Sequence, residues 1–132
     1  FLKLFEKIQE PFYIIGVARP FDLPTIKHEL VHGLFYTDQT YRSRVLETIK
    51  NLDIRTFEKA LKNSGYHPAV YKDETNAYAT TGMSELVEDG LSLKRTEPVK
   101  AVLKKVFVDH FHFSLARMGE QEVLDLVHRI KL

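Results

Sequence analysis

Cysteine does not occur anywhere in the 132 residues of this sequence. Its absence excludes disulfide bonds and thiolate metal sites, and it leaves histidine, aspartate and glutamate as the side chains able to hold a metal ion. Structural zinc sites are usually rich in cysteine, whereas catalytic zinc sites are often built from histidine and carboxylates. If this chain binds zinc, a catalytic site is therefore favoured over a structural one.

Neither sign of charge is in excess, because nineteen Lys and Arg residues stand against eighteen Asp and Glu residues and the basic ones are scattered. A nucleic-acid partner is therefore not expected. Long apolar runs are lacking too. No stretch approaches the roughly 20 apolar residues of a membrane span, and the first residues lack the apolar core and cleavage site of a signal peptide. We expect a soluble, cytoplasmic protein without a membrane partner, forming a single domain over residues 1–132.

The most informative motif is His28-Glu29-Leu30-Val31-His32. It lies within a helix that the pattern predicts over residues 24–36, with Asp22 or Thr25 as its N-cap. On a helix, the i,i+4 spacing places both imidazoles on the same side, about one turn apart, where two neutral ring nitrogens can bind one zinc ion. Glu29 can then reach a zinc-bound water and act as general base.

A catalytic zinc ion needs three protein ligands, so a further donor is required. Asp38 is one candidate, but Phe35 stands where a glycine would let the chain turn sharply back to the metal. Asp38 is better interpreted as the N-cap of the next helix. Glu74 is the second candidate, with Asp73 as its nearest rival. The milder interpretation makes Glu74 a solvated acid favoured by the dipole of its helix.

Together these segments resemble the gluzincin class of HExxH zinc metallopeptidases. The run His28-Glu29-Leu30-Val31-His32 matches the motif helix, and Glu74-Thr75-Asn76-Ala77 is similar to the second helix, where a small residue follows the Glu ligand. The resemblance implies that His28, His32 and Glu74 hold zinc. It also implies that a strand before the motif helix, here residues 12–17, aligns an extended substrate. Tyr78 stands where many gluzincins carry an aspartate.

The remaining patterns indicate a mainly helical chain. Apolar periodicity and capping residues predict one strand over 12–17, an extended stretch over 66–71, a short turn or helix over 84–89, and helices over 1–8, 40–52, 53–64, 74–81, 97–113 and 120–130. Asp73 is expected to cap the helix over 74–81, and Gly65 and Gly82 to follow helix ends. We therefore expect an α+β fold, a mainly helical zincin-like domain with a small β-sheet beside the metal-binding helix.

An oxyanion formed by attack on a peptide carbonyl would need a hydrogen-bond donor. Tyr78, His110 and His112 are the candidates that the sequence offers. The two histidines are two residues apart, so they share a face only in an extended segment, and the helical periodicity before them predicts that they diverge.

Two functions follow from these residues. The first is a zinc-dependent metallopeptidase that hydrolyses the bonds of a peptide or protein substrate through a zinc-bound water activated by Glu29. The alternative is a catalytically inactive zincin-like interaction or regulatory domain. The shortness of the chain favours this alternative. Zinc content separates the two, because absence of zinc favours the interaction domain.

Overall fold

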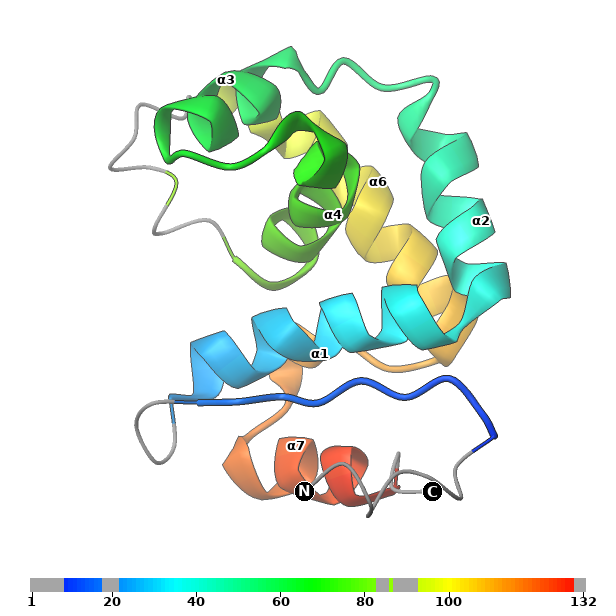
Figure 1. Ribbon diagram of the computed structural model, residues 1–132. Helices are drawn as coiled ribbons and strands as arrows, with labels where there is room; N and C mark the ends of the chain where they lie inside the picture. Colours follow the sequence, from blue (N-terminus) through cyan, green and yellow to red (C-terminus); the bar gives the residue numbers. More distant parts are fainter. Residues whose placement is uncertain (1–8, 18–21, 83–85, 87–92, 130–132) are drawn as a thin grey trace.

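Over most of the residues that the structure describes, the chain forms helices that pack against one another (Figure 1). The computed structural model describes residues 9–17, 22–82, 86 and 93–129. Within these ranges the α-helices include α1 (Leu23–Thr37), α2 (Gln39–Ile49), α3 (Arg55–Asn63), α4 (Tyr71–Thr81), α6 (Leu93–Phe111) and α7 (Glu120–Arg129). Two short 3₁₀ turns, η2 (Pro68–Val70) and η3 (Leu115–Arg117), lie between them.

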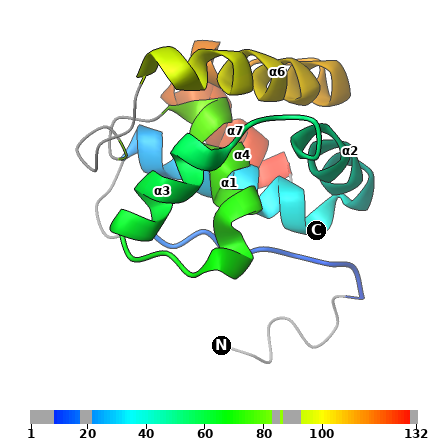
Figure 2. The same ribbon diagram turned by 90° about the horizontal axis from the view of Figure 1, so that it is seen from above.

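Helix α4 is the central element of this arrangement. It packs chiefly against α1 and α6, and α3 and α2 also contact it (Figure 2). Residues 75–80 are all buried, so this helix is enclosed on every side rather than along one stripe. Most of these side chains are small, which allows the neighbouring helices to approach closely. The close approach of α1 and α4 positions the candidate site.

The core forms where the apolar faces of the other helices meet around α4. Helices α2, α3 and α6 supply several of its largest fully buried side chains, among them Tyr41, Phe57, Leu61, Leu103 and Phe107. Tyr41 also donates a hydrogen bond from its hydroxyl to the side-chain oxygen of Asn76, at 3.2 Å. One polar contact is thereby built into the packing between α2 and α4.

The expected α+β class is wrong. Over the described ranges the fold is entirely helical, with no strand and no sheet. Residues 12–17 are extended, as their aromatic and β-branched composition favours, but no second strand lies beside them to form a ladder. This segment instead runs alongside α1 (Figure 1). The β-propensity of a segment predicts extended backbone, and a sheet also needs a partner strand.

Several helix boundaries are confirmed by their caps. Asp22 caps α1, with its side chain accepting hydrogen bonds from Thr25, and Asp38 caps α2, accepting from the Tyr41 N–H at 2.8 Å. Gly65 follows α3 with a φ of +87°, which a residue with a side chain rarely adopts, and Gly82 follows α4.

Two expectations around α4 are wrong. Residues 66–71 are not uniformly extended, because η2 occupies 68–70 and α4 already begins at Tyr71. Asp73 is therefore not an N-cap but lies in the first turn of α4. The helix starts earlier because Pro68 suits the first position of a helical turn, and His67 caps that turn by accepting from the Ala69 N–H.

The expected helices over 97–113 and 120–130 correspond to α6 and α7, and those over 40–52 and 53–64 to α2 and α3, with ends differing by a few residues. The helix expected over 1–8 lies outside the described residues, as does the segment 84–89 apart from Leu86. Within the ranges that the structure describes, no helix has the length and apolar character needed to cross a bilayer.

Asp38 links three elements, because it is the C-cap of α1 and the N-cap of α2, and its second carboxylate oxygen lies 2.8 Å from Nε2 of His110 on α6. Burial raises the pKa of Asp38, but the hydrogen bonds from Tyr41 and His110 outweigh it and hold the pKa below its ordinary value. The ionised Asp38 carboxylate therefore adds its full contribution to the free energy of unfolding at pH values above the ordinary carboxyl pKa. That contribution is lost as the pH falls through the lowered pKa of Asp38.

We predict that Asp38→Ala lowers the free energy of unfolding at pH 7 by about 2 kcal/mol, because both the cap and the partner of His110 are lost. Urea unfolding measures this loss, and the difference from wild type should shrink at pH 3. As a control, Asp109→Ala removes an exposed carboxylate on α6 and should change stability by less than about 0.5 kcal/mol. A loss that is equally large at pH 3 would contradict the role of the ionised carboxylate.

Candidate metal centre

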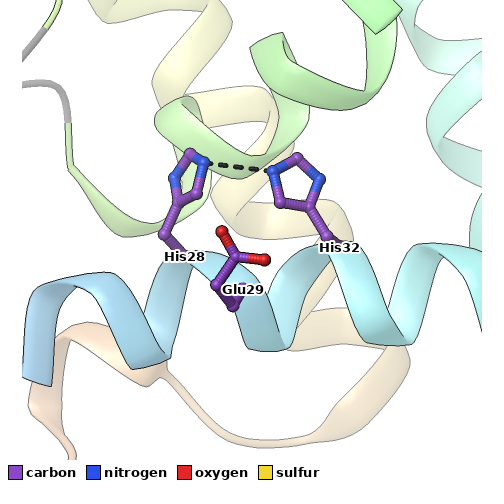
Figure 3. Close-up of side chains that lie close together, drawn as sticks. All are labelled: His28, Glu29 and His32. Carbon is purple, nitrogen blue, oxygen red and sulfur yellow. Dashed lines mark hydrogen bonds between the residues drawn. The ribbon is translucent and has the colours of Figure 1, made fainter. Parts of the chain in front are cut away.

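His28 and His32 project from the same side of α1, as their spacing requires (Figure 3). Their Nε2 atoms lie 3.1 Å apart and their ring planes are nearly perpendicular. The side chains are largely withdrawn from solvent, with 16% of His28 and 8% of His32 exposed. The helix alone thus creates a pair of converging imidazole nitrogens.

Helix α4 brings two carboxylates to this pair. Oε2 of Glu74 lies 3.4 Å from Nε2 of His28 and 3.4 Å from Nε2 of His32. Oδ1 of Asp73 lies 2.9 Å from the other ring nitrogen of His32, Nδ1. The structure therefore places both sequence candidates from α4 at the histidines, but against different atoms.

The spacing of the three atoms that face one another fits a zinc ion. In a tetrahedral site with metal–ligand distances near 2.1 Å, neighbouring ligand atoms are about 3.3–3.4 Å apart. The triangle formed by the two Nε2 atoms and Oε2 of Glu74 has sides of 3.1, 3.4 and 3.4 Å. Oε2 of Glu74 is also buried, and within the described residues its contacts are the two imidazole nitrogens at 3.4 Å, so a cation held between the three atoms would give it a closer partner. The residues present fit a metal ion.

Asp73 occupies the position from which a carboxylate orients a metal-binding imidazole. A histidine that binds metal through Nε2 commonly points its Nδ1–H at a carboxylate, which fixes the ring and increases its basicity. The two atoms here are 2.9 Å apart. Asp73 therefore supports His32 rather than competing with Glu74 for the same position.

The charges of the cluster respond to one another in the metal-free protein. Burial lowers the pKa of His32, but contacts with Asp73 and Glu74 raise it to about 10. Burial raises the pKa of Glu74, and the two imidazoles lower it to about 2. Within the described part of the chain, no Lys or Arg forms an ion pair with Glu29, Asp73 or Glu74. A divalent cation would balance these carboxylates.

Glu29 is close to the imidazoles without joining the triangle. One of its carboxylate oxygens lies within 4.8 Å of the ligand nitrogens of both His28 and His32. Its Oε2 accepts a hydrogen bond of 3.0 Å from the hydroxyl of Tyr13, which belongs to the extended segment beside α1. This is a suitable distance for a base that acts on a water at the metal.

A cavity of about 190 Å³ opens beside these groups. Its walls include His28, Glu29 and Glu74, together with two tyrosines, Tyr66 and Tyr78. The two phenol oxygens lie 3.0 Å apart, and the Tyr78 ring packs on His28 with ring centroids separated by 4.4 Å. A concave space that contains two candidate ligands, a base and hydroxyl groups is where a substrate would be expected to bind.

The other candidates from the sequence are placed elsewhere. Asp38 is engaged by Tyr41 and His110, as described above, and it does not line the cavity. His110 packs against Tyr41 and Phe111 rings. His112 directly follows α6, is exposed and has a φ of +64°. Of the three possible oxyanion donors, only Tyr78 lines the cavity.

Sequence reasoning missed Tyr13 and Tyr66. Tyr66 follows Gly65 in a loop, and nothing in its local pattern distinguishes it from a surface tyrosine. The sequence does point to Tyr13 indirectly, through Gly33. This glycine lies inside a helix, where it lowers helix stability by roughly 1 kcal/mol relative to alanine. Such a glycine suggests a close approach of another segment, and here that segment carries Tyr13.

Comparison of the chain with protein-family models finds no match, and comparisons with curated proteins and with solved structures find none either. The geometry of the site and the motifs of the sequence are therefore the observations that bear on function.

We predict that the protein purified without chelator contains one zinc ion per chain, and that Glu74→Ala loses it because one of the three ligand atoms is removed. Asp73→Ala should retain zinc with an affinity about 10–100-fold lower, since His32 is then no longer oriented. Asp38→Asn, which removes a carboxylate away from the site, should bind zinc as the wild type does. Elemental mass spectrometry and zinc titration measure these values. A wild type without zinc, or unchanged affinity in Glu74→Ala, would contradict the assignment.

Proposed function

We propose that this protein is a zinc-dependent metallopeptidase in which His28, His32 and Glu74 hold the metal and Glu29 activates water to hydrolyse peptide bonds. The observation that carries the proposal is the triangle of ligand atoms with sides of 3.1, 3.4 and 3.4 Å, together with Glu29 within 4.8 Å of both imidazoles. The substrate class comes from the resemblance of α1 and α4 to the two ligand-bearing helices of gluzincins.

Each residue has a separate task in this proposal. A bound zinc ion lowers the pKa of water toward about 7 and polarises the carbonyl under attack. Glu29 accepts the proton of the attacking water and later donates it to the departing amine nitrogen, so that its carboxylate is regenerated. Asp73 keeps the His32 ring in place, at 2.9 Å from Nδ1.

The cavity supports hydrolysis of a bound substrate rather than metal storage. It is open to solvent beside Glu29 and the ligands, so a carbonyl group can reach the base. Tyr78 lies at its wall with its hydroxyl 3.0 Å from that of Tyr66. One of these phenols can donate to the oxygen that becomes negatively charged when water attacks the carbonyl.

We predict that Glu29→Gln lowers kcat/KM on a fluorogenic peptide library at least about 100-fold, because the amide cannot accept the proton of water. Zinc content, measured by elemental mass spectrometry, should remain at the wild-type value. The matched control is Glu47→Gln, an exposed glutamate on α2 that pairs with Lys50 and should leave turnover unchanged. Full activity of Glu29→Gln would reject the mechanism. Zinc binding without turnover by the wild type would favour the inactive interaction domain.

Tyr78→Phe tests the oxyanion donor. We predict that kcat falls about 100-fold with little change in KM, because the lost hydrogen bond forms only as charge develops on the substrate oxygen. Tyr66→Phe, which removes the other phenol, should have a smaller effect if Tyr78 is the donor. His112→Ala should leave kcat unchanged, since its exposed side chain does not line the cavity. If the effect of Tyr66→Phe exceeds that of Tyr78→Phe, the two roles are reversed.

A further inference from the structure

The extended segment 9–17 is held against α1 at one well-defined point. Figure 1 shows it running alongside that helix. A Cβ atom added to Gly33 would lie 3.2 Å from Cδ1 and 3.4 Å from Cβ of Tyr13, so the absence of a side chain at Gly33 lets the tyrosine approach the helix this closely. The ring of Tyr13 also faces that of Tyr36, at a centroid distance of 6.4 Å. Tyr13 therefore has a fixed position although 41% of it is exposed.

The contact that this position creates is with Glu29. The Tyr13 hydroxyl donates to Oε2 of Glu29 at 3.0 Å. Burial, and then the hydrogen bond and charge of Glu29, raise the pKa of Tyr13 to about 12, so the phenol remains a donor at neutral pH. Tyr13, which does not line the cavity, thereby donates to one oxygen of the Glu29 carboxylate, while Glu29 itself lines the cavity wall.

Glu29 needs such a restraint because of where it lies. His28, Glu29 and His32 each offer an atom within 4.8 Å of the others, which is close enough for all three to hold one ion. A carboxylate bound to the metal is a weaker base for the proton of the attacking water, since the cation neutralises part of its charge. A base next to a metal has to be held close to the ion without coordinating it.

We propose that Tyr13 is a positioning residue for Glu29: its hydrogen bond fixes the carboxylate in the orientation of a base and keeps it out of the metal's ligand set. This inference rests on the proposed peptidase function. Segment 9–17 takes the place of the expected substrate-aligning strand in sequence, and its tyrosine acts on the catalytic base.

The test is Tyr13→Phe, which keeps the ring against Gly33 and removes only the hydroxyl. We expect kcat to fall at least about tenfold with KM within about twofold of wild type, because the substrate contacts are unchanged. In protein loaded with Co²⁺, the visible spectrum should change as Glu29 joins the ligands. In the Tyr13→Phe/Glu29→Gln double variant, the spectrum should match that of Glu29→Gln alone. Tyr36→Phe, an exposed tyrosine beside Tyr13, is the matched control and should behave as wild type.

Gly33→Ala provides a second variant that separates positioning from stability. Alanine favours a helix more than glycine does, so its helix propensity should not lower the Tm of the protein. The added Cβ presses on Tyr13 and should lower kcat, and the same substitution should have no further effect in the Tyr13→Phe background. A merely structural role of Tyr13 would give additive losses.

An unchanged kcat or an unchanged Co²⁺ spectrum in Tyr13→Phe overturns the inference, and so does an equal loss of residual activity when Tyr13→Phe is made in the Glu29→Gln background. These results leave the peptidase proposal intact, provided that the wild type binds metal and cleaves peptides. A wild type that binds no metal overturns both.

Discussion

The close packing of α1 against α4 is the constraint on which the candidate site depends. Residues 75–80 of α4 are buried together, and most have small side chains, so α1 can lie near enough for His28 and His32 to meet Glu74. Since interhelical distance depends on the side chains at the contact, larger residues on α4 would move its carboxylates away from the imidazoles. The polar groups of the site are thus positioned by apolar packing around them.

The same packing gathers negative charge beside the two imidazoles. Three carboxylates, from Glu29, Asp73 and Glu74, converge on two imidazoles, and the described residues place no Lys or Arg in an ion pair with them. In the metal-free protein, His32 compensates part of this charge by holding its proton. Binding of a divalent ion would displace that proton, so any metal affinity of this site should depend on pH.

Expectations based on neighbouring residues were largely accurate. The helix carrying His28 and His32, the cap supplied by Asp38 and the glycine that follows α3 each depend on hydrogen bonds and dihedral angles within a few residues. The prediction of a small sheet was wrong because it depends on residues far apart in the sequence: a strand requires a partner from elsewhere in the chain. Two tyrosines belong to the site only because the fold places them beside α1 and α4: Tyr13, on that extended segment, and Tyr66, in a loop.

By itself, the sequence determined the side chains that α1 presents: two imidazoles one turn apart with a glutamate beside the first, because helical geometry depends only on local spacing. By lacking cysteine, it left histidine, aspartate and glutamate as the candidate metal ligands. The tertiary structure decided which carboxylate meets which nitrogen, Glu74 facing both Nε2 atoms and Asp73 facing Nδ1 of His32. That choice depends on the distance and rotation between two packed helices, which many side chains determine jointly and no short motif encodes.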